Sequence, residues 1–318
     1  MLKAGIVGSN ISINKYLKVF EKLRCYDFVG YFDPTDTDTS DSIFGVPIYN
    51  TFLKQVDAVI FADEYTDTTE DLIIETIKSS KHLITDGFLL RDSHNMNYCE
   101  KLNKEAAVCF QVANVESTKP AFTTMLQYLN RVESFKLTRF VNYNKGSRND
   151  DLYRYIAKDV EMALKAINNN VQRVKVSPVS VFNETWDKIT IKIDFDNGAS
   201  ADLLFSRLSD CDKAEAECYQ PHKYYKADLV NSNCTEVKKH SETEIQLNFN
   251  TEISLPLTQP KLAFTDKQVM MYDAFEKDFV NFYDSCLNHV SPLVGIEESR
   301  QVIKVIKKVE HALEKLYV

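Results

Sequence analysis

The chain has 318 residues, enough for about two folded domains, and its 44% hydrophobic content excludes a disordered or low-complexity protein. Its 46 Asp and Glu residues outnumber its 38 Lys and Arg residues, so the net charge of −8 disfavours nucleic-acid or membrane-surface binding and favours small-molecule or protein partners. The chain starts without a signal-peptide pattern, and no apolar run reaches the roughly 18 residues of a membrane span, so we expect a cytoplasmic protein with no membrane contact.

The seven cysteines are scattered along the chain and form no C-x-x-C pair. This pattern predicts buried thiols rather than a disulfide framework or a zinc site. The six histidines also form no pair with metal-ligand spacing, so no metal is expected.

The first part of the chain alternates short apolar runs with amphipathic stretches, which is the pattern of βαβ units. Strands are predicted at residues 4–7, 28–32, 57–62, 82–85 and 107–112. Helices are predicted at residues 14–23, 69–79 and 93–105. These elements define a Rossmann-type, doubly wound parallel sheet, which we place in a first domain of residues 1–119.

From Pro120 onward the strands alternate polar and apolar residues, which is typical of an antiparallel sheet with one covered face. Predicted strands at residues 190–195 and 200–205 flank Asp196-Asn197-Gly198, a hairpin signal. Helices are predicted at residues 121–132, 159–167 and 297–316. We expect residues 120–318 to form an α+β domain with a large, mostly antiparallel sheet, whose open polar face is a candidate surface for homo-oligomer formation.

The loop after the first predicted strand is where a dinucleotide fold binds a pyrophosphate, because backbone N–H groups and a helix N-terminus point at the anion. Against the G-x-G-x-x-G pattern, Gly8 is retained, but Asn10 and Ile13 replace the other two glycines. The predicted dinucleotide contacts in this loop are Gly8, Ser9, Asn10 and Ile11.

Asp33 follows the second predicted strand, 25 residues after Gly8 (33 − 8 = 25). An acidic side chain at this place accepts hydrogen bonds from ribose hydroxyls and repels a 2′-phosphate, so Asp33 favours NAD over NADP. The alternative is that Asp33-Pro34 is simply a turn.

Short segments along nearly the whole chain resemble the glucose-fructose oxidoreductase, inositol dehydrogenase and MocA (Gfo/Idh/MocA) family. They are Lys3-Ala4-Gly5-Ile6-Val7-Gly8, Val29-Gly30-Tyr31-Phe32-Asp33, Phe44-Gly45-Val46-Pro47-Ile48-Tyr49, Val56-Asp57-Ala58-Val59-Ile60, Ser80-Lys81-His82-Leu83-Ile84-Thr85-Asp86, Pro120-Ala121-Phe122, Asp196-Asn197-Gly198-Ala199 and Ala274-Phe275 through Phe282. The resemblance implies an oxidoreductase that uses NAD or NADP and acts on a sugar- or polyol-like small molecule.

The motifs that carry the family's chemistry are altered in this chain. The E-K-P positions read Asp86-Gly87-Phe88, and Ala62 begins the stretch where the family has a Thr-Pro pair. By position, Ala62 and Asp86 remain candidate cofactor contacts.

The family's D-x-G-x-H-x-x-D motif resembles Arg154-Tyr155-Ile156-Ala157-Lys158-Asp159-Val160-Glu161, so Lys158 replaces the catalytic histidine. A lysine serves as a general base only if its pKa falls, and we expect Arg154, near Lys158 at the start of a helix, to contribute to that. The alternative is that Lys158 is a surface lysine, or a salt-bridging lysine with Asp159 or Glu161 nearby.

The family's G-H-x-x-R-F segment reads Ala113-Asn114-Val115-Glu116-Ser117-Thr118, so its substrate-side His and Arg become Asn114 and Ser117. Two functions therefore compete. One is an oxidoreductase with a modified site, and the other is a catalytically inactive relative that binds a ligand or a protein on the same scaffold.

Overall fold

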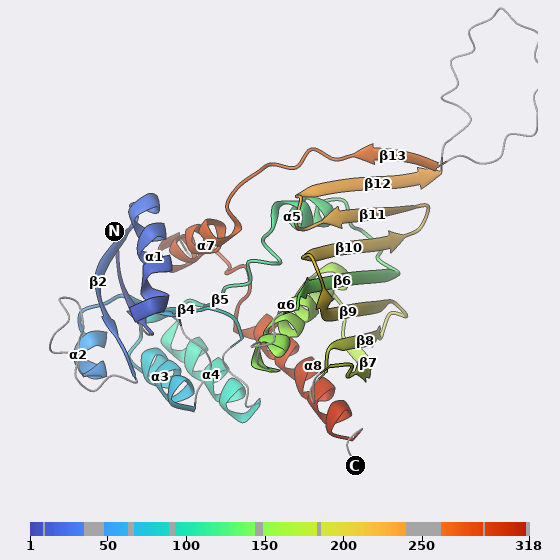
Figure 1. The fold of residues 1–318 in the computed structure, drawn as a ribbon. Helices are drawn as coiled ribbons and strands as arrows, with labels where there is room; N and C mark the ends of the chain where they lie inside the picture. Colours follow the sequence, from blue (N-terminus) through green and yellow to red (C-terminus); the bar gives the residue numbers. More distant parts are fainter. Residues whose placement is uncertain are drawn as a thin grey trace, which may run out of the picture.

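The structure is a computed structural model that describes residues 1–8, 10–34, 48–62, 67–88, 93–143, 149–182, 186–239, 262–288 and 290–315. It contains a five-stranded and an eight-stranded sheet, with α6 and α8 lying between them (Figure 1). Among the described residues, no helix is both long enough and apolar enough to cross a bilayer.

The first sheet is parallel and has the order β2-β1-β3-β4-β5. Its strands are β1 (Leu2–Val7), β2 (Tyr26–Phe32), β3 (Ala58–Phe61), β4 (His82–Thr85) and β5 (Phe110–Val112). All four residues of β3 are buried, as expected of a strand with both faces covered. The predicted doubly wound sheet is confirmed.

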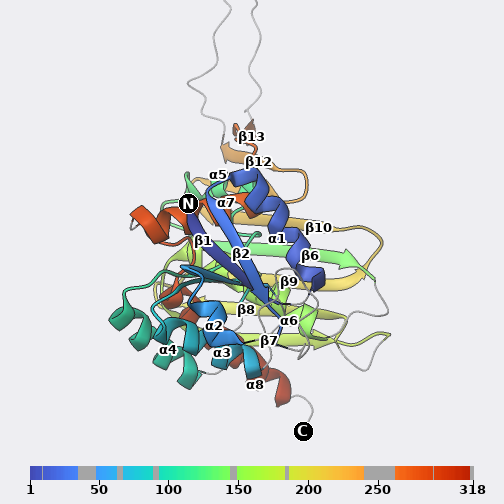
Figure 2. The same cartoon turned by 90° about the vertical axis from the view of Figure 1, so that its left-hand side faces the viewer.

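Helices cover both faces of this sheet (Figure 2). The helices of the first part are α1 (Asn10–Leu23), α2 (Tyr49–Leu53), α3 (Asp67–Lys78) and α4 (Ser93–Ala106). One face packs against α1 and against α7 (Ala274–Asn288), whose Phe279 and Phe282 are buried beside Tyr16 and Phe20 of α1. The other face packs against α2, α3, α4 and α8 (Ile296–Glu314).

The second sheet has the order β13-β12-β11-β10-β6-β9-β8-β7, and its β6–β9 pair is parallel while the other pairs are antiparallel. Its strands are β6 (Ser134–Asn142), β7 (Val171–Val179), β8 (Lys188–Phe195), β9 (Ser200–Ser209), β10 (Lys213–Gln220), β11 (Lys223–Asp228), β12 (Asn233–Lys239) and β13 (Leu262–Asp266). The predicted mostly antiparallel sheet is therefore confirmed.

The predicted hairpin joins β8 and β9. Gly198 has a φ of +83°, and its N–H donates to the Phe195 carbonyl at 3.0 Å. Ile189, Ile191, Ile193 and Phe195 of β8 are all buried, which confirms the predicted alternation.

The helix predicted at residues 121–132 is shorter in the structure. It is α5 (Pro120–Leu126), which ends six residues before residue 132. Gln220 of β10 explains this end. Its side-chain oxygen accepts the Asn130 N–H at 3.0 Å, and its side-chain nitrogen donates to the Tyr128 carbonyl at 3.1 Å. These bonds satisfy backbone groups that a longer helix would pair internally.

A larger correction concerns α6 (Asn149–Ile167), which begins ten residues before the predicted start at Asp159. Arg154 and Lys158 are therefore inside a helix and not at its start.

Candidate active site at the carboxyl edge of the parallel sheet

Three predicted cofactor contacts lie at one edge of the first sheet. Gly8, Ala62 and Asp86 directly follow the neighbouring strands β1, β3 and β4. The Ala62 N–H donates to the Val7 carbonyl at 2.9 Å, and the Asp86 N–H donates to the Phe61 carbonyl at 2.9 Å. The carboxyl edge of a doubly wound sheet is where this architecture binds ligands.

The backbone at Gly8 retains the conformation that a glycine permits. Its φ is +154°, its N–H donates to the Phe32 carbonyl at 3.0 Å, and α1 begins two residues later. Ile13 is 5% exposed and packs in the core beneath α1, so its side chain does not occupy the loop. Of the residues at this loop that the structure describes, Gly8 and Ile13 are therefore compatible with a phosphate group at the N-terminus of α1.

Of the other predicted contacts, the structure describes Asp33 but not all of the loop after Gly8. Asp33 directly follows β2 and is buried. Ser9 lies outside the described residues, and so do the side chains of Asn10 and Ile11.

Two side chains from α1 hold the Asp86 carboxylate. The Tyr16 hydroxyl donates to Asp86 Oδ2 at 2.7 Å, and Lys15 Nζ donates to the same oxygen at 3.2 Å. Burial alone would raise the pKa of Asp86, but the charges of Lys15 and Lys158 and the bond from Tyr16 lower it below its usual value. Asp86 therefore favours its ionised form, and the neighbouring charge of Lys15 compensates the carboxylate.

Beside Asp86, Gly87 has a φ of +96°, and open space surrounds the place where its Cβ would be. Phe88 occupies the third position of the altered motif. It packs against the core of the second sheet and also against the core between the first sheet and helices α2, α3, α4 and α8.

Lys158, on α6, lines a pocket at this edge together with Asp86, Gly87 and Phe88. Burial lowers the pKa of its amine, Asp86 and Glu116 raise it, and Arg154 and Lys15 lower it, with a net pKa below the usual value. Arg154 acts in the predicted direction, but burial is the larger cause. Among the described residues, no carboxylate lies within 4 Å of Lys158 Nζ.

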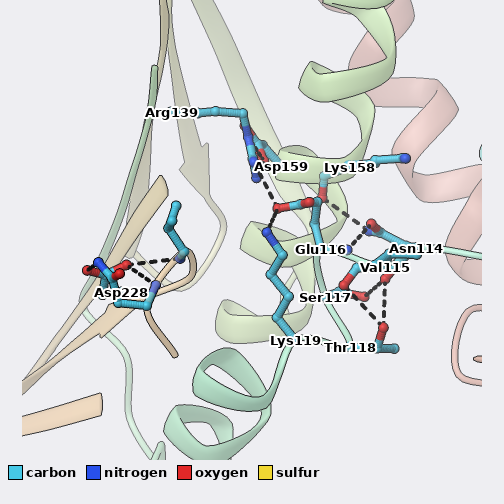
Figure 3. A network of polar contacts seen from close by, with 12 residues as sticks. Asn114, Val115, Glu116, Ser117, Thr118, Lys119, Arg139, Lys158, Asp159 and Asp228 are labelled. Atoms are coloured by element: carbon cyan, nitrogen blue, oxygen red, sulfur yellow. Dashed lines mark hydrogen bonds and ion pairs between the residues drawn. The ribbon is translucent and has the colours of Figure 1, made fainter. Parts of the chain in front are cut away.

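The salt-bridge alternative for Lys158 is wrong, because Asp159 and Glu161 have other partners. Arg139 of β6 binds Asp159 through Nε at 3.0 Å and through Nη2 at 2.6 Å. In Figure 3 the Lys158 side chain extends away from this pair.

Arg139 is the centre of a buried charge cluster that joins three parts of the chain. Its Nη1 lies 2.8 Å from the carboxylate of Glu116, which also binds Lys119 at 3.0 Å (Figure 3). Burial raises the pKa of Asp159, against the charge of Arg139. The cluster fixes α6, and with it Lys158, to β6 and to the loop that leaves β5.

Asn114 and Ser117, the residues at the family's substrate-side positions, are buried and have structural contacts. The Asn114 amide donates to Glu161 at 2.8 Å and to the Lys158 carbonyl at 3.3 Å. The Ser117 hydroxyl donates to the Asn114 carbonyl at 3.2 Å. Asn114 therefore contacts α6 directly, and Ser117 bonds to the Asn114 backbone.

Lys158 and Arg154 line a groove of about 920 Å³ between α6 and the strands of the second sheet. Its rim includes the turn after Asp228, whose carboxylate accepts the N–H groups of Val230 and Asn231, each at 2.9 Å (Figure 3). Six cations line the groove: Lys119, Arg139, Arg154, Lys158, Arg207 and Lys213.

Sequence reasoning missed two of these groove residues, Arg139 and Arg207, although their strands carry a signal. In β6 the inward positions run Phe135, Leu137, Arg139, and β9 likewise ends its inward apolar series with Arg207. A charge at an inward position requires a buried partner, which for Arg207 is Asp187 at 2.8 Å.

Comparisons with known proteins support the fold alone. No protein-family model matches the chain, and no curated protein matches it in sequence. The UDP-N-acetylglucosamine 3-dehydrogenase GnnA of Acidithiobacillus ferrooxidans is similar in structure with a TM-score of 0.84 at 15% identity, covering 98% of this chain and 97% of that chain.

Two further structures are similar over nearly their whole length. A dehydrogenase (MviM) of Clostridium difficile has a TM-score of 0.75 at 18% identity, covering 98% of this chain and 99% of that chain. A levoglucosan dehydrogenase, solved with NADH and L-sorbose, has a TM-score of 0.78 at 11% identity, covering 99% and 97%. The fold is thus the two-domain fold of Gfo/Idh/MocA-type dehydrogenases, as the resemblance predicts.

Proposed function

We propose that this protein is an NAD(P)-dependent oxidoreductase that acts on a sugar- or polyol-like small molecule bound in the groove. The proposal rests on the environment of Lys158. Its partly buried amine has a lowered pKa, and Lys158 lines both a pocket at the carboxyl edge of the parallel sheet and the groove. A lowered lysine pKa in a cleft is characteristic of acid–base sites.

Gly8, Ser9, Asn10 and Ile11 would bind the pyrophosphate, and Asp33 would accept bonds from a ribose, which favours NAD over NADP. Ala62 and Asp86 would lie along the rest of the dinucleotide. When bound, the nicotinamide supplies the acceptor for a hydride from the substrate carbon.

The chain's own residues handle the proton. Neutral Lys158 Nζ would accept the proton of the substrate hydroxyl as the C–H bond breaks, and in reduction its charged form would return it. The Arg139 cluster holds the helix that carries Lys158, while Lys15 and Tyr16 hold Asp86 beside it.

A panel of sugars and polyols with NAD⁺ or NADP⁺ tests the proposal through the absorbance of the reduced nicotinamide. We expect turnover by the wild type and a roughly 10²- to 10⁴-fold loss in Lys158→Ala. Lys175→Ala, an exposed lysine on β7, is the matched control and should retain wild-type rates. Equal rates in Lys158→Ala and wild type would contradict the role of Lys158.

The inactive-relative alternative has one observation in its favour, because Gly87 and Phe88 occupy positions where the family has Lys and Pro. A protein that binds a ligand in the groove but transfers no hydride with any substrate of the panel would support this alternative.

A further inference from the structure

We propose that Asp278 of α7 is a buried proton-binding site, whose carboxyl group stays protonated at neutral pH and donates its O–H to Gln111 of β5. The inference goes beyond the proposed function and does not depend on it, because it concerns the junction between α7 and the parallel sheet.

The Asp278 side chain is enclosed by the fold. It is 1% exposed, and neither of its carboxyl oxygens has a hydrogen-bond partner among the residues that the structure describes. An ionised carboxylate in such a place loses its hydration and gains no donor in return, which is strongly unfavourable. The protonated form avoids this cost, because a neutral acid has an O–H of its own and needs an acceptor for it.

Gln111 supplies the acceptor that a protonated Asp278 requires. The Gln111 side chain is fully buried, and its Nε2 donates to the backbone carbonyl of Asp278 at 2.9 Å. This bond fixes which amide atom is the nitrogen, since a carbonyl only accepts. Gln111 Oε1 is then a second buried acceptor that has no partner within the described part of the chain. One proton between the two side chains satisfies both groups.

The charged groups around Asp278 come from α6 and from the end of β4, and they do not supply a counter-ion. Lys165 Nζ lies 3.6 Å from the buried carboxylate of Glu161, so this ammonium already compensates another acid. Burial raises the pKa of Asp278 to about 8, against the charge of Lys165. Glu161 and Asp86 raise this pKa as well, and Lys158 lowers it.

The position of Asp278 links its proton to the attachment of α7. This helix follows β13 in the chain and packs beside α1 on the first sheet, with Phe279 and Phe282 in the core (Figure 1). The proton on Asp278 therefore stabilises the contact that fixes the chain leaving the second sheet to the first sheet. Because an ionised Asp278 is unfavourable in this contact, the attachment weakens as the pH rises.

Urea unfolding of the wild type and of Asp278→Asn at several pH values tests the inference. The unfolded carboxyl group ionises above pH 3.8 and the folded one only above about 8, so the wild type loses stability as the pH rises between these values. We expect its unfolding constant, relative to that of Asp278→Asn, to rise roughly tenfold per pH unit in this range and to level off above it. The Asn amide does not titrate and carries a permanent donor for Gln111 Oε1.

Asp284→Asn is the matched control, because Asp284 lies on the same helix and is partly exposed. It should keep the wild-type dependence of stability on pH. Infrared spectra give a second readout that the wild type alone supplies. We expect a C=O stretching band of a protonated carboxylic acid at mildly acidic pH, which disappears as the pH rises through about 8 and which folded Asp278→Asn lacks.

Three results would overturn the inference. The first is a ratio of the two unfolding constants that does not change with pH. The second is a protonated-acid band that remains in Asp278→Asn and so belongs to another group, such as Glu161. The third is the absence of any such band, as expected of an ionised Asp278 that binds a buried water or a cation. No measurement here involves a dinucleotide or turnover, so failure of the proposed function would leave the inference standing.

Discussion

Lys158 is a charged group in a partly buried place, and its ionisation is linked to folding. Below its lowered folded-state pKa the amine is charged in both the folded and the unfolded chain, and burial makes that charge unfavourable. As pH rises through the lowered folded-state pKa toward 10.5, the folded chain loses its proton first, so this cost disappears.

Lys158→Met should therefore stabilise the protein near neutral pH, and the gain should shrink as pH approaches 10.5. Urea unfolding of both proteins at several pH values measures this difference. A variant that is less stable at neutral pH, or a gain that does not change with pH, would contradict the lowered pKa.

The Arg139–Asp159 pair is the second feature at the scale of single residues. Removing one partner of a buried ion pair leaves the other charge uncompensated, so Arg139→Met should cost about 3–5 kcal/mol of unfolding free energy. Adding Asp159→Leu should recover part of the loss. If the double variant is as unstable as the sum of the two single variants, the pair is not coupled.

At the scale of elements, Gly5 sets how closely α2 packs against β1. A Cβ at Gly5 would lie 2.4 Å from the ring of Phe52 and 2.8 Å from Val56 Cγ1. Gly5→Ala should therefore lower the unfolding free energy by about 1–3 kcal/mol, as overpacked cores do. Phe52→Leu in the same chain should restore part of it, and thermal unfolding measures both effects.

Elements with a strong local pattern were predictable. Residues 82–85 form β4 as predicted, and β8 and β9 alternate around their hairpin as their sequences indicate. The end of α5 was not, because it depends on a distant group, the side chain of Gln220 on β10. A local pattern carries no signal for such contacts.

At the scale of the whole molecule, order and spacing of motifs predicted the two sheets, and strand ends predicted where Gly8, Ala62 and Asp86 meet. The groove was not predictable in this way, since its walls come from residues as far apart as Glu116 and Ser232. The inward arginines of β6 and β9 were the available signal for it.

Self-association stays a prediction. The sheet carries exposed, charged rows such as Lys136 with Glu217 and Lys226 with Glu215, and we expect a second copy of the chain to cover its open face. Light scattering at increasing concentration measures the mass. A monomer at the highest concentration would contradict this expectation.

The proposed function requires that the turn at Gly8 and the ends of β1, β3 and β4 bind a dinucleotide. Calorimetric titration with NADH and NADPH tests it most directly, with Gly8→Val as the variant whose side chain is strained at a φ of +154°. We expect saturable binding by the wild type, tighter for NADH, and loss of binding in Gly8→Val. No binding of either dinucleotide by the wild type at millimolar concentration would contradict it.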